Sequence, residues 1–156
     1  MTWRRVEFSV LILLVWLFAL LPRPARADSW SNPHELTAPS ANGQFMARTQ
    51  PASATQPASL RVSRKDGAPL WQAQLTNKVS PVEVMITDDG EGVITFDNWG
   101  QVGYGDDVLA FYGRKGQLTR YSLEQILGVE KVALDDPSVS LSVSSRWWRP
   151  HGITFL

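Results

Sequence analysis

The chain has 156 residues with 15 basic and 15 acidic side chains, and it contains no cysteine. A chain of this length builds one modest domain around a core of its own. Without cysteine it has neither a disulfide nor a thiolate that could serve as nucleophile or metal ligand.

Residues 1–27 have the pattern of a secretory signal peptide. A pair of arginines near the N-terminus precedes a predominantly apolar run at 8–21, and Ala25 and Ala27 stand where signal peptidase requires small side chains. Cleavage after Ala27 predicts an exported protein, periplasmic or extracellular. The alternative is an uncleaved membrane anchor at 8–21, although this run is short for a span of about 20 residues. Contact with a membrane is expected only in that case.

Cleavage changes the charge of the protein. Four basic residues and one acidic residue leave with residues 1–27, so the mature part keeps 11 basic and 14 acidic residues. A weakly acidic domain without a basic run lacks the concentrated positive charge that phosphate backbones require. Nucleic acid is therefore not an expected partner.

Four glycine-centred turns recur at steps of 24, 23 and 26 residues. They are Asn42-Gly43, Asp66-Gly67, Asp89-Gly90 and Lys115-Gly116. Each turn lies between two short apolar stretches, which is the pattern of a β-hairpin. The predicted fold is therefore mainly β, with antiparallel hairpins over residues 41–146.

The sequence from residue 28 to about residue 76 predicts an irregular lead-in followed by three strands. Residues 28–40 are polar and rich in proline, and we expect them to be irregular. A strand is expected at 45–47, with Phe45 and Ala47 on one face, and apolar and polar side chains alternate at 60–63 and 71–75, as in half-buried strands. Residues 50–59 are rich in Pro, Ala, Ser and Thr, which is typical of an exposed loop.

The second half repeats this scheme. Residues 82–86 and 93–96 are predicted to pair around their turn, and residues 118–121 to follow the next one. Residues 108–112 are apolar at every position, which predicts a central strand covered on both faces.

A short helix follows the last of these strands. Ser122 and Gln125 fit a capping box, which predicts one or two helical turns over 123–127. An alternating strand at 139–143 then precedes a C-terminal tail at 147–156.

Part of the chain resembles a known repeat. The features that carry the resemblance are Pro-x-x-Asn-Gly-x-Phe-x-Ala at 39–47, Leu-x-Val at 60–62, the Asp66-Gly67 turn and Leu70-Trp71. Residues 41–76 resemble one blade of a β-propeller of the WD-repeat or PQQ type, and 82–122 resemble a second. Because a propeller ring needs 4–8 blades, the resemblance implies a shortened member or an assembly of several copies. A small sandwich of hairpins is the remaining alternative.

The loop at 97–107 is the strongest candidate for a binding site. It carries two aromatic, three acidic and three glycine residues between two apolar stretches. Trp99 and Tyr104 can stack on a sugar or another flat ligand, while Asp97 and Asn98 supply directional hydrogen bonds. The alternative is a purely structural loop whose aromatic side chains cover the edge of a sheet.

Other polar groups give no catalytic or metal site. Asp88, Asp89 and Glu91 lack the alternating spacing of a calcium loop and suit a tight turn. His34 and His151 have no companions at ligand spacing, and no familiar nucleophile motif occurs. We therefore predict no catalytic residue, no metal and no cofactor.

The expected function is a non-catalytic binding or scaffold module outside the cytoplasm, with a glycan or another envelope protein as partner. Some exported propellers act on sugars or lactones, so a carbohydrate-active or lactone-type hydrolase is the alternative. An inactive truncated fragment is a third. Trp147-Trp148 is predicted either to end a strand over the core or to form an exposed contact patch.

Overall fold

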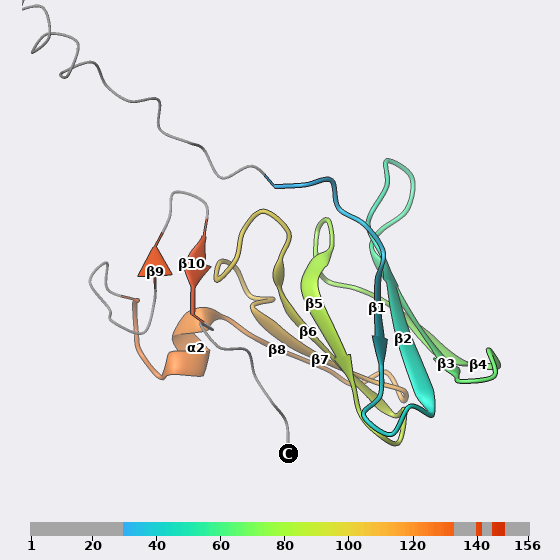
Figure 1. The fold of residues 1–156 in the computed structure, drawn as a ribbon. Helices are drawn as coiled ribbons and strands as arrows, with labels where there is room; N and C mark the ends of the chain where they lie inside the picture. The colour runs from blue at the N-terminus through green and yellow to red at the C-terminus, as the bar shows by residue number, and fades with distance from the viewer. Residues whose placement is uncertain (1–29, 133–139, 142–144, 149–156) are drawn as a thin grey trace, which may run out of the picture.

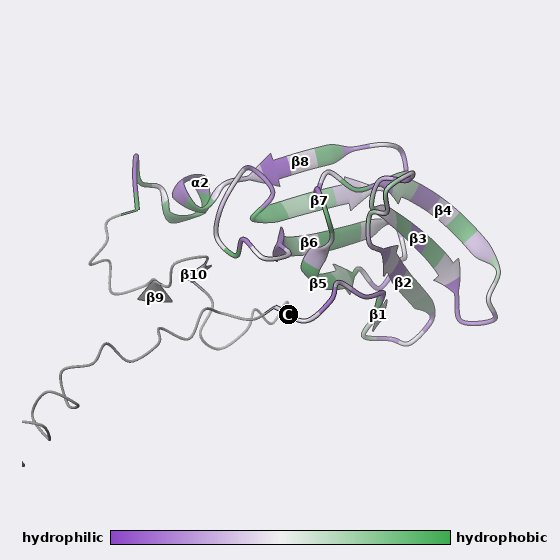
Figure 2. Cartoon of the chain, turned by 90° about the horizontal axis from the view of Figure 1, so that it is seen from above, coloured by the Kyte–Doolittle hydropathy of each residue, from purple (hydrophilic) through white to green (hydrophobic). Residues whose placement is uncertain are grey.

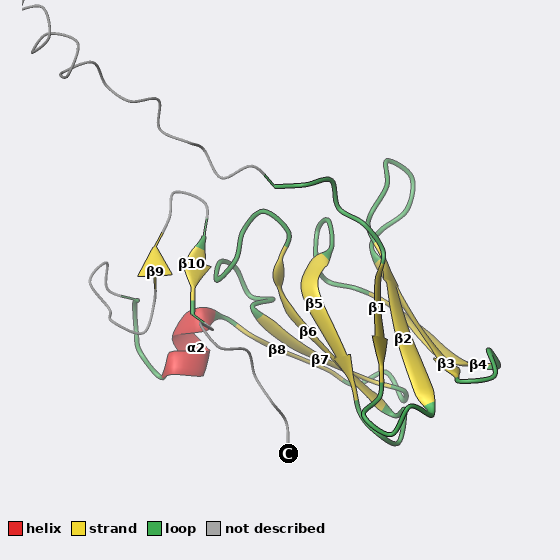
Figure 3. Cartoon of the chain, in the orientation of Figure 1, coloured by secondary structure: helices red, strands yellow, loops and turns green. Residues whose placement is uncertain are grey.

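The computed structural model describes residues 30–132, 140–141 and 145–148. Residues 1–27, with the predicted signal peptide or anchor, and most of the expected strand at 139–143 lie outside them. Within the described residues the elements are β1 (Leu36–Pro39), β2 (Phe45–Gln50), β3 (Ser59–Arg64), β4 (Pro69–Gln74), β5 (Pro81–Ile86), β6 (Gly92–Asn98), β7 (Leu109–Gly113), β8 (Leu118–Tyr121), α2 (Leu123–Leu127), β9 (Ser140–Leu141) and β10 (Arg146–Trp147). The predicted mainly β fold with one short helix is confirmed (Figure 3).

Eight of these strands form two antiparallel sheets of four strands each (Figure 1). The first sheet has the order β1-β2-β3-β4 and the second the order β5-β6-β7-β8, so each is an uninterrupted meander. All four predicted turns join paired strands, and their glycines have φ between 67° and 87°, a conformation that only glycine adopts freely. Because meanders of four strands occur in many β folds, the propeller resemblance stays a prediction.

The two sheets share one core. Each contributes the apolar side chains of one face, and these are Ala47, Leu60, Val62 and Leu75 from the first sheet and its end and Val84, Val93, Ala110 and Tyr112 from the second. Figure 2 shows the sheets from above, with β5 beside β1. The side-chain alternation along each strand thus places its apolar set between the sheets.

Two segments differ from expectation. Residues 36–39, within the segment expected to be irregular, form β1 and pair with β2, because Leu36 and Ala38 alternate with polar side chains and pack on the core. β7 is a central strand as predicted, but the expectation that both its faces are covered is wrong. Phe111 is 37% exposed and contacts Tyr121 edge to face on the outer side of the sheet.

The helix follows its sequence signals closely. The Ser122 hydroxyl accepts a hydrogen bond from the Gln125 amide, and the Gln125 side chain accepts one from the Ser122 amide. Gly128 ends the helix in the left-handed conformation, with φ 68°. The predicted capping box is confirmed.

A contact between two turns fastens the sheets to each other at the lower end in Figure 1. The Asn42 amide donates to Asp88 Oδ1 at 2.8 Å, and Asn42 Nδ2 donates to the Asp88 carbonyl at 2.7 Å. Trp71 Nε1 of β4 donates to the Gly90 carbonyl at 2.7 Å. The turns that the sequence predicts as local features therefore also hold the tertiary structure.

Replacing Gly90 by alanine tests this contact, with Gly67→Ala as the matched control. Both glycines have positive φ, but an added Cβ would meet nothing within 4 Å at Gly67 and would lie 2.6 Å from the Phe45 ring at Gly90. We expect Gly67→Ala to lower the free energy of unfolding by about 1–2 kcal/mol. Gly90→Ala should cost at least about 1 kcal/mol more, since it also overpacks the contact. Urea denaturation measures both, and equal losses would contradict the turn-to-turn contact.

Candidate functional site

The candidate loop joins β6 to β7 at the upper end of the molecule in Figure 1. Two of the predicted binding residues, Asp97 and Asn98, are the last two residues of β6, and the rest of the loop follows them. Gly100, Gly103 and Gly105 all have positive φ, so the loop turns repeatedly within a few residues.

Asp97 lies beneath the loop and not on its surface. The residue is 2% exposed and has φ 58°, which is uncommon for a residue other than glycine. Its Oδ1 accepts hydrogen bonds from the Gly103 amide at 2.7 Å and from Trp148 Nε1 at 3.0 Å. Asp97 therefore ties the two sides of the loop together and connects them to the C-terminal part of the chain.

Residues 145–148, here called the C-terminal strap, lie along the loop. The Arg146 amide donates to the Val102 carbonyl at 2.8 Å, and the Arg146 guanidinium lies 4.2 Å from the centre of the Tyr104 ring. A Cβ at Gly103 would lie 2.6 Å from the Arg146 carbonyl oxygen, so only glycine fits there. The strap thus fixes the loop through backbone, aromatic and carboxylate contacts.

An ion pair connects the strap to the helix. Arg146 Nη1 lies 2.7 Å from Glu124 Oε1, and both side chains are largely covered. Burial works to raise the pKa of Glu124, but hydrogen bonds from its own backbone amide and from Arg146 outweigh it and hold the pKa below its ordinary value. Burial likewise opposes the charge on Arg146, but the hydrogen bond to Glu124 keeps the pKa of Arg146 above its ordinary value.

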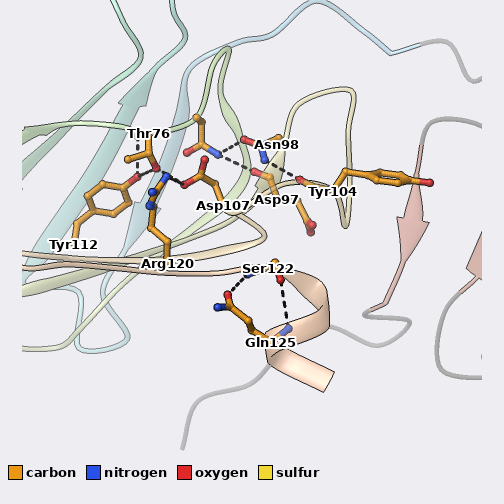
Figure 4. A network of polar contacts seen from close by, with 10 residues as sticks. Thr76, Asp97, Asn98, Tyr104, Asp107, Tyr112, Arg120, Ser122 and Gln125 are labelled. Carbon is orange, nitrogen blue, oxygen red and sulfur yellow. Dashed lines mark hydrogen bonds and ion pairs between the residues drawn. The ribbon is translucent and has the colours of Figure 1, made fainter. Parts of the chain in front are cut away.

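Asn98 is held by amide contacts on two sides (Figure 4). Its Oδ1 accepts from Asn77 Nδ2 at 2.8 Å, and its Nδ2 donates to the Tyr104 carbonyl at 3.2 Å. Asn77 Nδ2 also donates to the Asp97 carbonyl at 3.1 Å. The start of the loop is therefore anchored to the segment that connects the two sheets.

A hollow of about 640 Å³ opens between this loop and the connecting segment. Its walls combine an aromatic ring with amide and charged groups, contributed among others by Lys78, Asn98, Trp99, Gln101, Asp107 and Arg120. Tyr104 lines it as well, whereas Asp97 does not. The structure thus brings together three of the four predicted ligand-binding residues and assigns the fourth to the support of the loop.

One side of the hollow is fixed by a polar network (Figure 4). The Thr76 hydroxyl donates to Asp107 Oδ1 at 2.6 Å and lies 2.9 Å from the buried Tyr112 hydroxyl, which accepts from the Thr76 amide at 3.0 Å. Arg120 Nη1 lies 3.3 Å from the same carboxylate oxygen. Asp107 is therefore pre-oriented, and its second carboxylate oxygen has no hydrogen-bond or ion-pair partner within the part of the chain that the structure describes.

Four aromatic rings gather beside the hollow, and we call them the aromatic cluster. Trp30 lies edge to face with Trp99 at 5.3 Å and nearly parallel to Trp147 at 6.3 Å, and His34 lies edge to face with Trp99 at 5.5 Å. Trp99 Nε1 also donates to the Ser31 carbonyl at 3.2 Å. Trp147 remains 47% exposed, so the cluster presents an aromatic surface to solvent.

The two residues of Trp147-Trp148 differ in burial, and a contact patch at Trp147 stays a prediction. Trp148 packs on the small core of Val108, Leu123 and Val132, whereas Trp147 is the exposed one. Sequence reasoning missed the contribution of Trp30 and Thr76, because their positions carry no local signal and only the fold brings them to the loop.

The acidic turn at 88–91 behaves as a turn. Asp89 Oδ1 accepts from the Thr87 hydroxyl and from the Glu91 amide, and Asp88 binds Asn42 as described above. Among the described residues, no group of three or more His, Cys, Asp or Glu side chains is placed to hold a metal ion.

Searches of protein-family models, curated proteins and solved structures found no significant match to this chain. Over residues 30–132, 140–141 and 145–148, no helix is long and apolar enough to cross a bilayer.

Trp148→Phe tests the link between strap and loop, with Trp147→Phe as the control at the neighbouring position. Phenylalanine at 148 removes the donor to Asp97, whereas the indole N–H of Trp147 has no hydrogen-bond partner among the described residues. A hydrogen bond to a charged group is worth about 1.5–3 kcal/mol, so hydrogen exchange at the Gly103 amide should accelerate about tenfold or more in Trp148→Phe. Equal exchange rates in the two variants would show that Trp148 does not hold the loop.

The Glu124–Arg146 pair predicts a pH-dependent part of the stability. Because the folded pKa of Glu124 lies below its ordinary value, the pair stabilises the fold fully above that ordinary value and loses its effect as the pH falls through the folded pKa. Urea denaturation at pH 6, 4 and 3 should show wild type more stable than Glu124→Gln at pH 6, with the difference shrinking toward pH 3. A constant difference would contradict the assigned ion pair.

Proposed function

We propose that this chain is a non-catalytic binding module that acts outside the cytoplasm and recognises a glycan in the hollow beside the 97–107 loop. The observation that carries the proposal is the lining of that hollow. Trp99 offers an apolar ring face next to the amides of Asn98 and Gln101 and the carboxylate of Asp107. Sites for small polar ligands combine these two kinds of surface.

The chemistry of a sugar suits this arrangement. A pyranose has an apolar C–H face that packs on an aromatic ring and hydroxyl groups that both donate and accept hydrogen bonds. The amide of Gln101 can donate and accept, the ammonium of Lys78 donates, and the Asp107 carboxylate accepts.

The support of the loop favours binding as well. Asp97, Asn77 and the C-terminal strap hold the loop from below, and Asp107 is oriented by Thr76 and Arg120. A site that is fixed before the ligand arrives loses less conformational freedom on binding. The aromatic cluster extends the apolar surface beyond the hollow, which suits a ligand longer than one sugar ring.

Export rests on the signal-peptide pattern of residues 1–27, and retention of residues 8–21 as an anchor would keep the module at a membrane surface. Another envelope protein is the alternative partner, with the aromatic cluster as its contact.

The test uses the full-length gene and the protein that cells produce from it. Its intact mass is expected to be that of a chain that starts at Asp28. A glycan panel then identifies a bound sugar, and calorimetry measures the affinity for it. Trp99→Ala should weaken binding about tenfold, since an aromatic contact contributes about 0.5–1.5 kcal/mol beyond its buried area. Gln101→Ala, an exposed position in the same lining, should weaken it several-fold. Phe111→Ala, at an exposed aromatic position on the second sheet, is the matched control and should bind like wild type.

Other outcomes separate the alternatives. Release of products from a bound glycan or lactone would favour a hydrolase, and aggregation of the folded chain would favour a truncated fragment. An intact mass that includes residues 1–27 would favour the anchor. If no glycan on the panel binds, or if Phe111→Ala loses as much affinity as Trp99→Ala, the hollow is not a glycan site.

A further inference from the structure

The outer face of the first sheet, which points away from the shared core, carries a row of polar side chains. The strand register places Thr37, Arg48, Arg61 and Gln72 opposite one another across β1 to β4. On the next rows Ser63 lies opposite Met46, and Ser59 lies between Gln50 and Gln74.

The two arginines in this row are direct cross-strand neighbours. Arg48 and Arg61 are partners in the β2–β3 register, and such partners have Cβ atoms about 4.5–5.5 Å apart. Like charges at this separation repel each other. A single anion that accepts hydrogen bonds from both guanidinium groups would relieve the repulsion, since arginine presents several donors in a fixed fork.

The acidic side chains nearby do not neutralise the pair. Glu35 Oε1 lies 3.3 Å from Arg48 Nε, and both side chains are well exposed, so the contact is weak. Asp66 uses its Oδ1 to accept from the Ala68 amide in its turn. Within the described part of the chain the Arg61 side chain has no ion-pair or hydrogen-bond partner.

The surface is hollowed at this place. A depression of about 630 Å³ is lined by both arginines, by Ser63 and Gln72, and by the apolar parts of Met46 and Leu70. The guanidinium groups thus lie beside neutral donors and acceptors on a shaped surface.

The charge of the chain is also unevenly distributed. Residues 30–76, which hold the first sheet, have four basic and two acidic side chains, whereas residues 77–132 have five basic and nine acidic ones. An anion that approaches the protein is therefore attracted to the first sheet and repelled by the second.

We infer that the outer face of the first sheet is a second binding site, in which Arg48 and Arg61 together hold a carboxylate or sulfate group of an acidic glycan. The site is separate from the hollow beside the 97–107 loop and goes beyond the proposed function. Ser63 and Gln72 face the neighbouring hydroxyl groups of the sugar, and Met46 and Leu70 its apolar edge.

Two other anionic partners fit this face less well. None of the strongly exposed large apolar side chains among the described residues comes from residues 30–76, so the face lacks the apolar contacts that fasten proteins to anionic membranes. Four basic side chains offset by two acidic ones give too little positive charge to follow a nucleic-acid backbone.

The experiment measures binding of the full-length gene product to polygalacturonate, to dextran sulfate and to uncharged dextran by calorimetry. We expect binding to at least one of the two anionic polymers, none to uncharged dextran, and an affinity that falls as salt is added. Arg61→Gln and Arg48→Gln should each weaken binding about tenfold or more, the effect of losing one charge-assisted hydrogen bond. Arg61→Lys keeps the positive charge but removes the planar guanidinium with its paired donors, so it should lower the affinity less than Arg61→Gln does.

Arg114→Gln is the matched control, because Arg114 is an exposed arginine on the second sheet that pairs with Glu91. It should bind like wild type, and so should Trp99→Ala, which separates this site from the hollow. The inference fails if neither anionic polymer binds or if Arg114→Gln loses as much affinity as Arg61→Gln. It also fails if vesicles with anionic lipids bind as tightly as the polymers through Arg61.

Discussion

Each sheet of this protein has an apolar face that needs a cover, and the two sheets cover each other. A four-stranded meander with one uncovered apolar face would expose the apolar side chains of that face to water, which is unfavourable. Burial of Leu60, Val62, Val93 and Tyr112 in one shared core removes that surface from solvent. The loop, the hollow and the row of arginines all depend on this packing, since each lies at an edge or on a face that the packing creates.

The outer faces of the two sheets differ in character. The first sheet presents Arg48, Arg61 and Gln72 to solvent, whereas the second presents Phe111 and Tyr121.

At the end of the core, Asp97 shows how a buried carboxyl group can organise a surface. It binds the Gly103 amide and Trp148 Nε1 from inside, which leaves the loop's amide and aromatic side chains to face outward.

Much of the fold was predictable because its signals are local. The glycine turns need left-handed backbone angles, the strands alternate in hydrophobicity, and Ser122 with Gln125 closes a capping box, so each element is encoded within a few residues. The site was predictable only in part. In its local sequence Asp97 looks like a surface hydrogen-bond acceptor of the loop, and its role depends on Trp148, which lies 51 positions away. The pairing of Arg48 with Arg61 likewise follows from strand register, which the spacing of turns does not specify at the level of single residues.

The strap lies outside the two large sheets, whose eight strands are complete at Tyr121. Its contacts with Asp97 and Tyr104 can therefore open while all eight strands stay paired. Segments held by few contacts open locally at a lower free energy than the core does. The shape of the 97–107 loop thus has a stability of its own, separate from that of the sheets, and a change confined to the strap alters the loop before it alters the core.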